Sequence, residues 1–390
     1  MAHASPGKQA AGITALLVLT ALSLVTMFCS IGKGLKILGN RDLELGTSPP
    51  LASCIGETPP GKISAQLRAE ARATNESDLV TEQNSGALPT IGFVGLGNMG
   101  GPMCRRLVAA GYPVMAYDIN PDALAAAAEA GAVAGESATA CAAQAELFMT
   151  SLPRPDHVAS VMTGSDGALA AMQPGSIWVD LTTNRKEFVA ELAAQAPAGV
   201  HVVDSPVTGA VDGARQGKLT LFIGGDDDAV ARAKVPLDHL GLVIECGELG
   251  HGNVVKLVTN QLWFIAAAAI GEGFATGMAN GVDLGTLWYA IKESVGDSFV
   301  ARHDAPSIFA GHYDPSFSLD LCLKDLGLVR ELGENVNTTL PMTAAAHDVF
   351  AEAAERYGND VGELHVAKRI EDDANLSMRL EGDWTPHWEK

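Results

Sequence analysis

The stretch Thr90-Ile-Gly-Phe-Val-Gly-Leu-Gly-Asn-Met-Gly100 decides the fold. A short apolar run enters three glycines spaced as G-x-G-x-x-G, which are Gly95, Gly97 and Gly100. A helical pattern follows over residues 102–110, and a second apolar run, residues 111–117, ends at Asp118. This order of strand, glycine turn, helix, strand and acidic residue predicts a dinucleotide-binding βαβ unit.

Each glycine of this turn has its own physical role. The first lets the chain turn tightly, the second lets the backbone approach a pyrophosphate, and the third lets the helix pack closely on the sheet. Backbone amides at the start of the helix face the phosphates. We therefore expect the whole loop to contact the cofactor, namely Gly95, Leu96, Gly97, Asn98, Met99 and Gly100.

Asp118 bears on the choice of cofactor. It lies about 20 residues after the glycine turn, where a carboxylate binds the adenosine ribose hydroxyls and repels a 2′-phosphate. The residues that follow are Ile119-Asn-Pro121, without an arginine. The sequence therefore favours NAD over NADP.

The alternation of helix and strand continues. A helix is expected over residues 122–130, and strands over 132–134, 145–152 and 176–183. Because ligands bind at the carboxyl ends of parallel strands, we expect Leu152, Pro153, Thr182 and Thr183 to border the cofactor site. For each threonine taken alone, a helix N-cap is an equal alternative.

Composition narrows the classes of function. The chain has 390 residues, which suits two domains and a tail, and its net charge of -20 disfavours binding to nucleic acid. Its six cysteines form no C-x-x-C pair and no Cys/His cluster with the spacing of metal ligands. We predict reduced, mostly buried thiols and no metal site.

The N-terminal region carries an apolar segment. Residues 11–32 contain no charged side chain, and as a helix they span about 30 Å, enough for a bilayer core. The flanking lysines favour a membrane anchor with a cytosolic enzyme domain. A cleaved signal, or an incorrect start site on a soluble cytoplasmic or organellar enzyme, remain alternatives. Residues 46–88 are polar and predict a flexible linker.

Strand patterns end near residue 252. Residues 254–270 are apolar nearly all round, within a helix expected from Asn253 to about Asn280, and further helices are expected over 284–295, 321–336 and 343–357. The sequence thus predicts a Rossmann-type doubly wound α/β domain followed by an all-α domain. The predicted segments are a tail (1–45), the linker (46–88), an NAD(P)-binding domain (89–250), a helical substrate and dimerisation domain (251–375) and a C-terminal tail (376–390).

Four motifs resemble those of the β-hydroxyacid dehydrogenases. Residues 92–103 resemble the opening signature of that family, and residues 204–210 are similar to its D-A-P-V-S-G-G loop. Residues 250–260 match G-x-G-x-x-x-K-x-x-x-N, and Phe317 with Lys324-Asp325 matches a later F…K-D element. The family includes 3-hydroxyisobutyrate dehydrogenase and the glyoxylate and succinic semialdehyde reductases, with 6-phosphogluconate dehydrogenase more distant. The resemblance covers residues 90 to about 371.

The resemblance implies a site and a reaction. Lys256 corresponds to the acid/base that couples proton transfer to hydride transfer, and a position near a helix N-terminus lowers the pKa of a lysine. Asn260 lies one turn further on the same face and orients the substrate or the amine. By resemblance, Thr208, Gly209 and Ala210, helped by Thr182, hold the carboxylate of a small substrate, and Lys324 closes over the cofactor. The resemblance also implies a homo-oligomer.

Departures from the family pattern concern the substrate. Ala210 replaces a glycine and lacks its freedom in φ, and Arg185 and Lys186 add charge beside the Thr182 loop, which would suit a bulkier or more anionic acid. Two other functions compete with the dehydrogenase: a non-catalytic nucleotide-sensing or scaffold protein, and an imine reductase. The three glycines, Lys256 and Asn260 argue against the non-catalytic protein, and Lys256 argues against the imine reductase, whose relatives typically replace this lysine.

Overall fold

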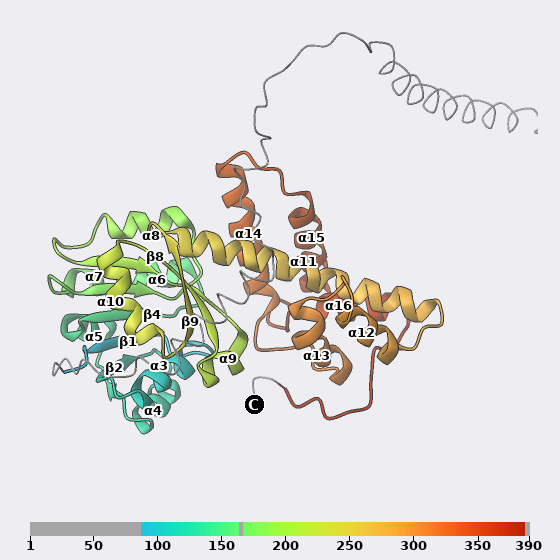
Figure 1. Cartoon of the computed structure of the whole chain (residues 1–390), viewed down its shortest axis with the longest axis horizontal. Helices are drawn as coiled ribbons and strands as arrows, with labels where there is room; N and C mark the ends of the chain where they lie inside the picture. Colours follow the sequence, from blue (N-terminus) through green and yellow to red (C-terminus); the bar gives the residue numbers. More distant parts are fainter. Residues whose placement is uncertain (1–86, 164–166, 387–390) are drawn as a thin grey trace, which may run out of the picture. The chain divides into compact units, whose positions relative to one another are not determined.

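The computed structural model describes residues 87–163 and 167–386 (Figure 1). The predicted apolar segment 11–32, the tail 1–45 and nearly all of the predicted linker 46–88 lie outside these residues, and so do the last four residues. The description that follows therefore concerns the α/β part and the helical part alone.

A nine-stranded sheet forms the core of the α/β part, counted over the described residues, with the strand order β3-β2-β1-β4-β5-β6-β8-β7 and β9 beside β8. Neighbouring strands from β3 to β6 are parallel, and β8 runs antiparallel to β6 and β7. The strands are β1 Ile91–Val94, β2 Val114–Tyr117, β3 Val133–Ala134, β4 Leu147–Thr150, β5 Ile177–Asp180, β6 His201–Asp204, β7 Val207–Thr208, β8 Leu219–Gly224 and β9 Gly241–Gly247. The order reverses between β1 and β4, which is the switch point where such sheets bind ligands.

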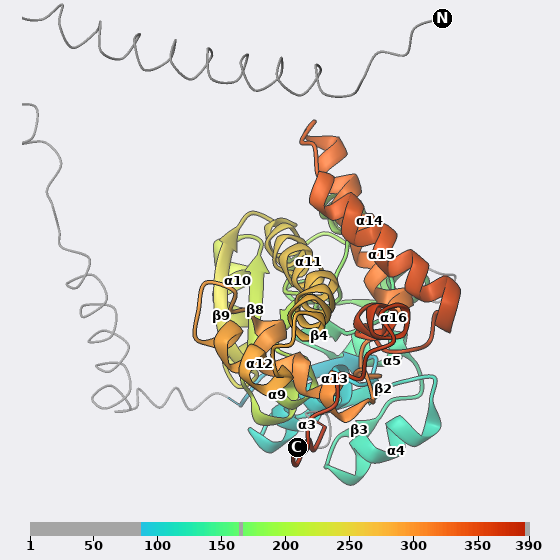
Figure 2. The same cartoon turned by 90° about the vertical axis from the view of Figure 1, so that its right-hand side faces the viewer.

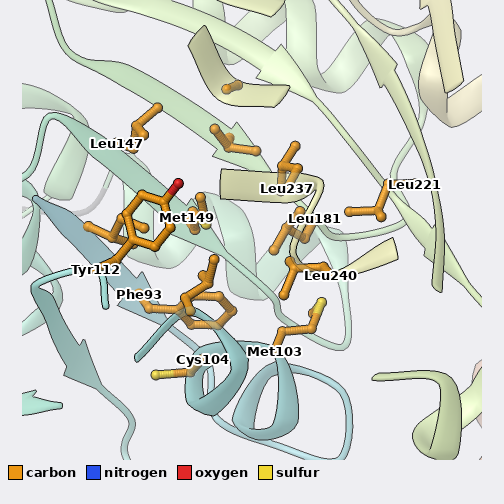
Figure 3. Close-up of a cluster of buried hydrophobic side chains, with 14 of the residues drawn as sticks. Phe93, Met103, Cys104, Tyr112, Leu147, Met149, Leu181, Leu221, Leu237 and Leu240 are labelled. Carbon is orange, nitrogen blue, oxygen red and sulfur yellow. The ribbon is translucent and has the colours of Figure 1, made fainter. Parts of the chain in front are cut away.

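Helices cover both faces of the sheet, so the central strands read as continuous apolar runs. Every residue of β1, β4 and β5 is buried. One face packs on α3, α4 and α10, and Figure 3 shows Phe93, Met103, Met149 and Leu237 of this cluster in contact. The other face packs around Trp178 on α5, α6, α7 and α8. The helices are α3 Gly100–Ala109, α4 Pro121–Glu129, α5 Ala138–Gln144, α6 Pro155–Thr163, α7 Ala168–Ala171, α8 Lys186–Ala193, α9 Ala210–Gln216 and α10 Asp227–Leu237.

The helical part is built around α11, which Figure 2 shows beside α14, α15 and α16. Phe264 and Phe274 of α11 are fully buried among aromatic side chains of the other helices. From the end of α16 to residue 386 the described chain has no regular secondary structure, yet Met378 is fully buried in the same core. The elements are α11 His251–Ala279, α12 Leu284–Lys292, η2 Val300–Asp304 (a π-helical turn), α13 Ala305–Ala310, α14 Leu319–Asn335, α15 Pro341–Tyr357 and α16 His365–Asp373.

The Rossmann-type sheet followed by an all-α domain is confirmed, with small shifts in helix bounds. The long helix begins at His251 rather than Asn253, because the Asp204 carboxylate accepts bonds from the amides of Gly250 and Asn253 at its start. The helix expected from residue 321 begins at Leu319, since Ser318 caps it and accepts from the amide of Leu321. Within the described ranges, α11 is the one helix long and apolar enough to cross a membrane, and it forms the core of the helical part.

Candidate active site

The glycine turn between β1 and α3 is closely packed on one side and open on the other. Gly95 has a φ of +93°, and a Cβ there would lie 2.2 Å from the carbonyl oxygen of Ser151. A Cβ on Gly100 would lie 1.9 Å from the carbonyl oxygen of Gly95, so only glycine allows the helix to approach the strand. A Cβ on Gly97 meets no atom within 4 Å. The open face at Gly97 fits a pyrophosphate lying against the backbone.

Asp118 lies at the end of β2, directly against this turn. One of its carboxylate oxygens accepts a bond from the Leu96 amide at 2.5 Å, and the other accepts from the Asn120 amide at 2.7 Å. Leu96 is buried, whereas Asn98 reaches the helical part, where its side-chain amide donates to the carbonyl oxygen of Ser316 at 3.4 Å. The predicted ribose ligand is thus placed beside the predicted phosphate loop.

The ends of β4 and β5 are joined by a hydroxyl. The Oγ1 of Thr182 accepts a bond from the Leu152 amide at 3.0 Å, and Thr182 is almost fully buried. Its own amide donates to Asp180 at 3.1 Å. Thr182, predicted as a substrate ligand, therefore fixes the two strand ends to each other. Thr183 is half-buried at the same edge.

A buried polar network sets the start of α11. Asp204 accepts bonds from the Gly250 amide at 2.6 Å and from the amide and side chain of Asn253 at 2.7 and 3.0 Å. The Oδ1 of Asn253 in turn accepts from the Asn184 amide at 2.7 Å, and the Asn184 side chain donates to Asp180 at 2.6 Å. Burial raises the pKa of both carboxyls to about 6, against the effect of these hydrogen bonds. The network locks α11, and the lysine on its second turn, to the ends of β5 and β6.

Four polar residues from two helices meet next to this start. Lys256 and Asn260 lie one turn apart on α11, and both are buried. Asn260 donates to Asp325 Oδ2 on α14 at 2.7 Å. Lys324 Nζ lies 2.9 Å from Asp325 Oδ1 and donates to the carbonyl oxygen of Pro153 at 3.2 Å. Lys324 thus spans from the helical part to the cofactor-binding edge of the sheet.

The surroundings of Lys256 lower its pKa. Burial, which disfavours the charged ammonium, has the largest effect and brings the pKa down to about 8, and the neighbouring charge of Lys324 acts in the same direction. The charge of Asp325 opposes both. A lysine with a pKa near 8 gains and loses a proton readily near neutral pH, which is the property that general acid/base catalysis requires.

The predicted substrate loop follows β7 and has an unusual backbone. Thr208, Gly209 and Ala210 are all half-buried, and Gly209 has a φ of +120°. Ala210 has a φ of 57°, a left-handed conformation that costs a residue with a Cβ about 1 to 2 kcal/mol. Ala210 therefore adopts a left-handed conformation that favours glycine, the residue that the family pattern has at this position.

The two basic residues that follow Thr183 have neighbours outside the predicted substrate loop. Arg185 pairs with Glu331 on α14 at 3.3 Å and lies over the ring of Phe188. The aliphatic part of Lys186 packs against Gly250, where an added Cβ would lie 2.7 Å from Lys186 Cγ. Arg185 thus fastens the α/β part to the helical part. The expectation that the added charges suit a bulkier or more anionic acid stays a prediction.

Sequence reasoning did not assign roles to Asp325, Asn184, Asp204 or Asn253. Asp325, Asp204 and Asn253 had a weak signal, because they stand within the quoted motifs, whereas Asn184 had none. Among the described residues no group of three His, Cys, Asp or Glu side chains is arranged to hold a metal. Cys104, Cys141 and Cys322 are buried free thiols whose pKa burial raises, as expected for inert cysteines.

Comparisons with known proteins agree with this architecture. Residues 90–248 match the model of the NAD-binding domain of 6-phosphogluconate dehydrogenase, and residues 250–370 match that of the NAD-binding domain of NADP-dependent 3-hydroxyisobutyrate dehydrogenase. The 3-hydroxyisobutyrate dehydrogenase of Pseudomonas aeruginosa is 34% identical over 295 residues, which cover 72% of this chain and 99% of that protein.

Two solved structures extend the comparison. The 3-hydroxyisobutyrate dehydrogenase of Mycobacterium tuberculosis with L-serine aligns with a TM-score of 0.67 at 31% identity, covering 73% of this chain and 99% of that one. Psf3 in complex with NADP+ and 2-OPP aligns with the same TM-score at 25% identity, covering 72% of this chain and 100% of that one. Fold and site define an NAD(P)-binding dehydrogenase. The chain belongs to the β-hydroxyacid dehydrogenase family, the oxidoreductases that act on CH–OH groups of small hydroxy acids.

Proposed function

We propose that the enzyme transfers a hydride between NAD(H) and a small β-hydroxy acid or its semialdehyde, with Lys256 as general acid/base. The observation that supports this most strongly is the buried position of Lys256, with its pKa lowered to about 8. The nicotinamide, when bound, supplies the hydride chemistry. Lys256 takes the hydroxyl proton during oxidation and returns it to the carbonyl oxygen during reduction. Asn260, held by Asp325, orients the oxygen or the amine.

The residues of the glycine turn fit the cofactor. Its pyrophosphate would lie over the open face of Gly97, against the amides that follow, with Leu152 and Pro153 at the neighbouring strand end. Asp118 would exchange its amide contacts with the turn for the ribose hydroxyls. A carboxylate at this place repels a 2′-phosphate, so we propose NAD as the preferred cofactor.

The proposed substrate is a small carboxylate. Thr208 offers a hydroxyl, and Gly209 and Ala210 offer amides, in a loop that leads directly into α9. Lys324, which bridges Asp325 and the Pro153 carbonyl, would keep water from the nicotinamide side of the site. In this arrangement the carboxylate is bound by the α/β part, and the reacting carbon is presented to Lys256.

Nicotinamide absorbance tests the proposal. The purified chain is given NADH or NADPH with glyoxylate, succinic semialdehyde or methylmalonate semialdehyde, beside Lys256→Ala. A rate of NADH oxidation that is about 10² to 10⁴ times lower in Lys256→Ala, with cofactor binding intact, supports the role of Lys256 as acid/base. A preference for NADPH contradicts the proposed role of Asp118. Cofactor binding without turnover of any of these substrates favours the non-catalytic nucleotide-sensing or scaffold alternative.

Two further proposals concern the setting of the enzyme. A homo-oligomer is supported by apolar side chains that α11 leaves exposed, Val258 at 44% and Leu262 at 64%, and sedimentation of Leu262→Glu tests it. Membrane anchoring through residues 11–32, with the enzyme domain in the cytosol, is supported by their length without charge. Recovery of the full chain in the membrane fraction, lost on deleting these residues, tests it against a soluble cytoplasmic or organellar enzyme.

A further inference from the structure

Trp263 lies on the same face of α11 as the two polar residues of the candidate site. At 3.6 residues per turn, Lys256, Asn260 and Trp263 fall within about 60° of one another around the helix axis. Side chains three positions apart on a helix are neighbours, and a helical side chain covers the turn that precedes its own Cα. The indole of Trp263 therefore covers the turn that carries Asn260.

Two segments outside α11 hold the indole in this place. Its N–H donates to Oδ2 of Asp304, a buried residue of η2, at 2.8 Å. Its ring centroid lies 5.4 Å from that of Phe317. Phe317 directly follows Ser316, whose carbonyl oxygen accepts the bond from Asn98 of the glycine turn. The pair of Trp263 and Phe317 therefore adjoins the point where the glycine turn contacts the helical part.

Burial distinguishes this pair from the aromatic core next to it. Phe264 and Phe350 are fully buried, with ring centroids 5.5 Å apart, and the ring of Phe264 lies 4.9 Å from that of Trp263. Trp263 and Phe317 are only half-buried. The two half-buried rings thus form the edge of this core, and the turn of Asn260 borders that edge.

We propose that Trp263 determines substrate specificity, because its indole leaves room for hydrogen but for no alkyl group on the reacting carbon. The inference rests on the proposed function, in which Asn260 orients the reacting oxygen. The reacting carbon is bonded directly to this oxygen, so a substituent on the carbon reaches the ring that covers the turn of Asn260.

The chemistry of the substrate decides which molecules this ring excludes. An aldehyde or a primary alcohol carries only hydrogen beside its chain at the reacting carbon, whereas a ketone or a secondary alcohol adds an alkyl group there. The bond to Asp304 and the contact with Phe317 fix the indole, so it cannot turn aside for the larger group. Trp263 therefore favours semialdehydes and primary hydroxy acids over the corresponding ketones and secondary alcohols.

The test uses pairs of substrates that differ by one methyl group on the carbonyl carbon. Glyoxylate is paired with pyruvate, succinic semialdehyde with 4-oxopentanoate, and methylmalonate semialdehyde with 2-methyl-3-oxobutanoate. The full chain is assayed with the reduced cofactor that the wild type prefers. Trp263→Leu is expected to raise the ketone-to-aldehyde ratio of kcat/KM by about tenfold or more over the wild type, since one methylene group in an apolar pocket changes kcat/KM by about 10- to 200-fold. Comparing each variant with the wild type cancels the intrinsic difference in reactivity between ketone and aldehyde.

Trp288→Leu is the matched control. Trp288 is a half-buried tryptophan of α12 whose N–H donates to the carbonyl oxygen of Ala301 at 2.7 Å, and its ring contacts Phe309 and Trp384. Its loss loosens the helical part away from the turn of the catalytic site and should leave the ratio at its wild-type value. Trp263→Phe keeps an aromatic ring and should shift the ratio in the same direction as Trp263→Leu by a smaller factor, so it decides the question if Trp263→Leu does not fold.

The outcomes separate this inference from the proposed function. A ratio that stays at its wild-type value in the folded Trp263 variants, or that rises equally in Trp288→Leu, overturns the inference, and so does a wild type that reduces a ketone as readily as its aldehyde. Reduction of an aldehyde with such a result leaves the proposed function standing. If the wild type reduces none of the three aldehydes, the proposed function fails and this inference falls with it.

Discussion

Replacing Asp325 by asparagine should lower the pKa of Lys256 further and shift the pH profile of the enzyme. The charge of Asp325 raises this pKa, whereas burial and Lys324 lower it, so removing the carboxylate leaves both lowering effects unopposed. Two unit charges about 5 Å apart in a medium of effective dielectric constant near 20 interact by about 3 kcal/mol. That energy corresponds to about two pH units, and solvent screening reduces the expected shift to about one to two.

The two directions of the reaction should respond with opposite sign. In the proposed mechanism oxidation needs neutral Lys256 as base, so in the wild type kcat/KM for the hydroxy acid should rise through about pH 8. Reduction needs the ammonium as acid, so its kcat/KM should fall over the same range. In Asp325→Asn the rise for oxidation and the fall for reduction should both move to lower pH by the same amount, because both depend on the protonation of Lys256.

The assay is a pair of pH–rate profiles of kcat/KM, one for each direction. Asparagine keeps an oxygen that can accept the hydrogen bond from Asn260, so the variant tests charge more than packing. Asp320→Asn is the matched control, because Asp320 lies on the same helix but pairs with Arg154 at the surface and should leave both limbs in place. Limbs that stay unmoved in Asp325→Asn, or move to higher pH, would refute the assignment of Lys256 as the titrating acid/base.

Two further changes test the backbone of the site. Gly97→Ala should weaken cofactor binding by roughly tenfold or more with little change in Tm, since the added methyl enters open space where the pyrophosphate is expected. Gly100→Ala should instead lower Tm, because its Cβ would meet the Gly95 carbonyl oxygen at 1.9 Å. Calorimetry measures cofactor binding and thermal unfolding measures Tm, and equal losses of Tm in the two variants would contradict the reasoning. Ala210→Gly should raise the free energy of unfolding by about 0.5 to 1 kcal/mol, because glycine adopts a φ of 57° without strain. Denaturant titration measures this free energy, and a decrease would show that packing of the Ala210 methyl group outweighs the strain.

Local patterns were sufficient for the fold. Continuous apolar runs marked the buried parallel strands, and the glycine spacing marked the turn between β1 and α3, because these features depend on neighbours in sequence. Within the helix expected over residues 253–280, the spacing of four residues also placed Lys256 and Asn260 on one face, as found. The conformational cost foreseen at Ala210 is visible as its positive φ.

The partners of the site could not be predicted in the same way. Asp325 bonds to Asn260 across 65 positions of sequence, and Asn184 meets Asn253 across 69. No periodicity encodes such pairs, because they depend on how α11 and α14 pack and on where the strands end. Arg185 is another example, because its partner Glu331 lies on α14, 146 positions away in sequence.

The helix α11, with 29 residues, extends from the sheet of the α/β part into the helical part. Such a helix is about 43 Å long; its first turns pack against β8 and β9, and the rest lies in the core of the helical part. The contact between Asn253 and Asp204 secures the first end to β6, while Phe264 and Phe274 fill the core of the helical part. The α/β part and the helical part therefore share one continuous helix, so thermal unfolding of both should occur in a single cooperative step. Cutting the chain near residue 250 would leave Lys256, the proposed acid/base, on a fragment without the carboxylate that caps its helix, and neither half should be recoverable as an independent module.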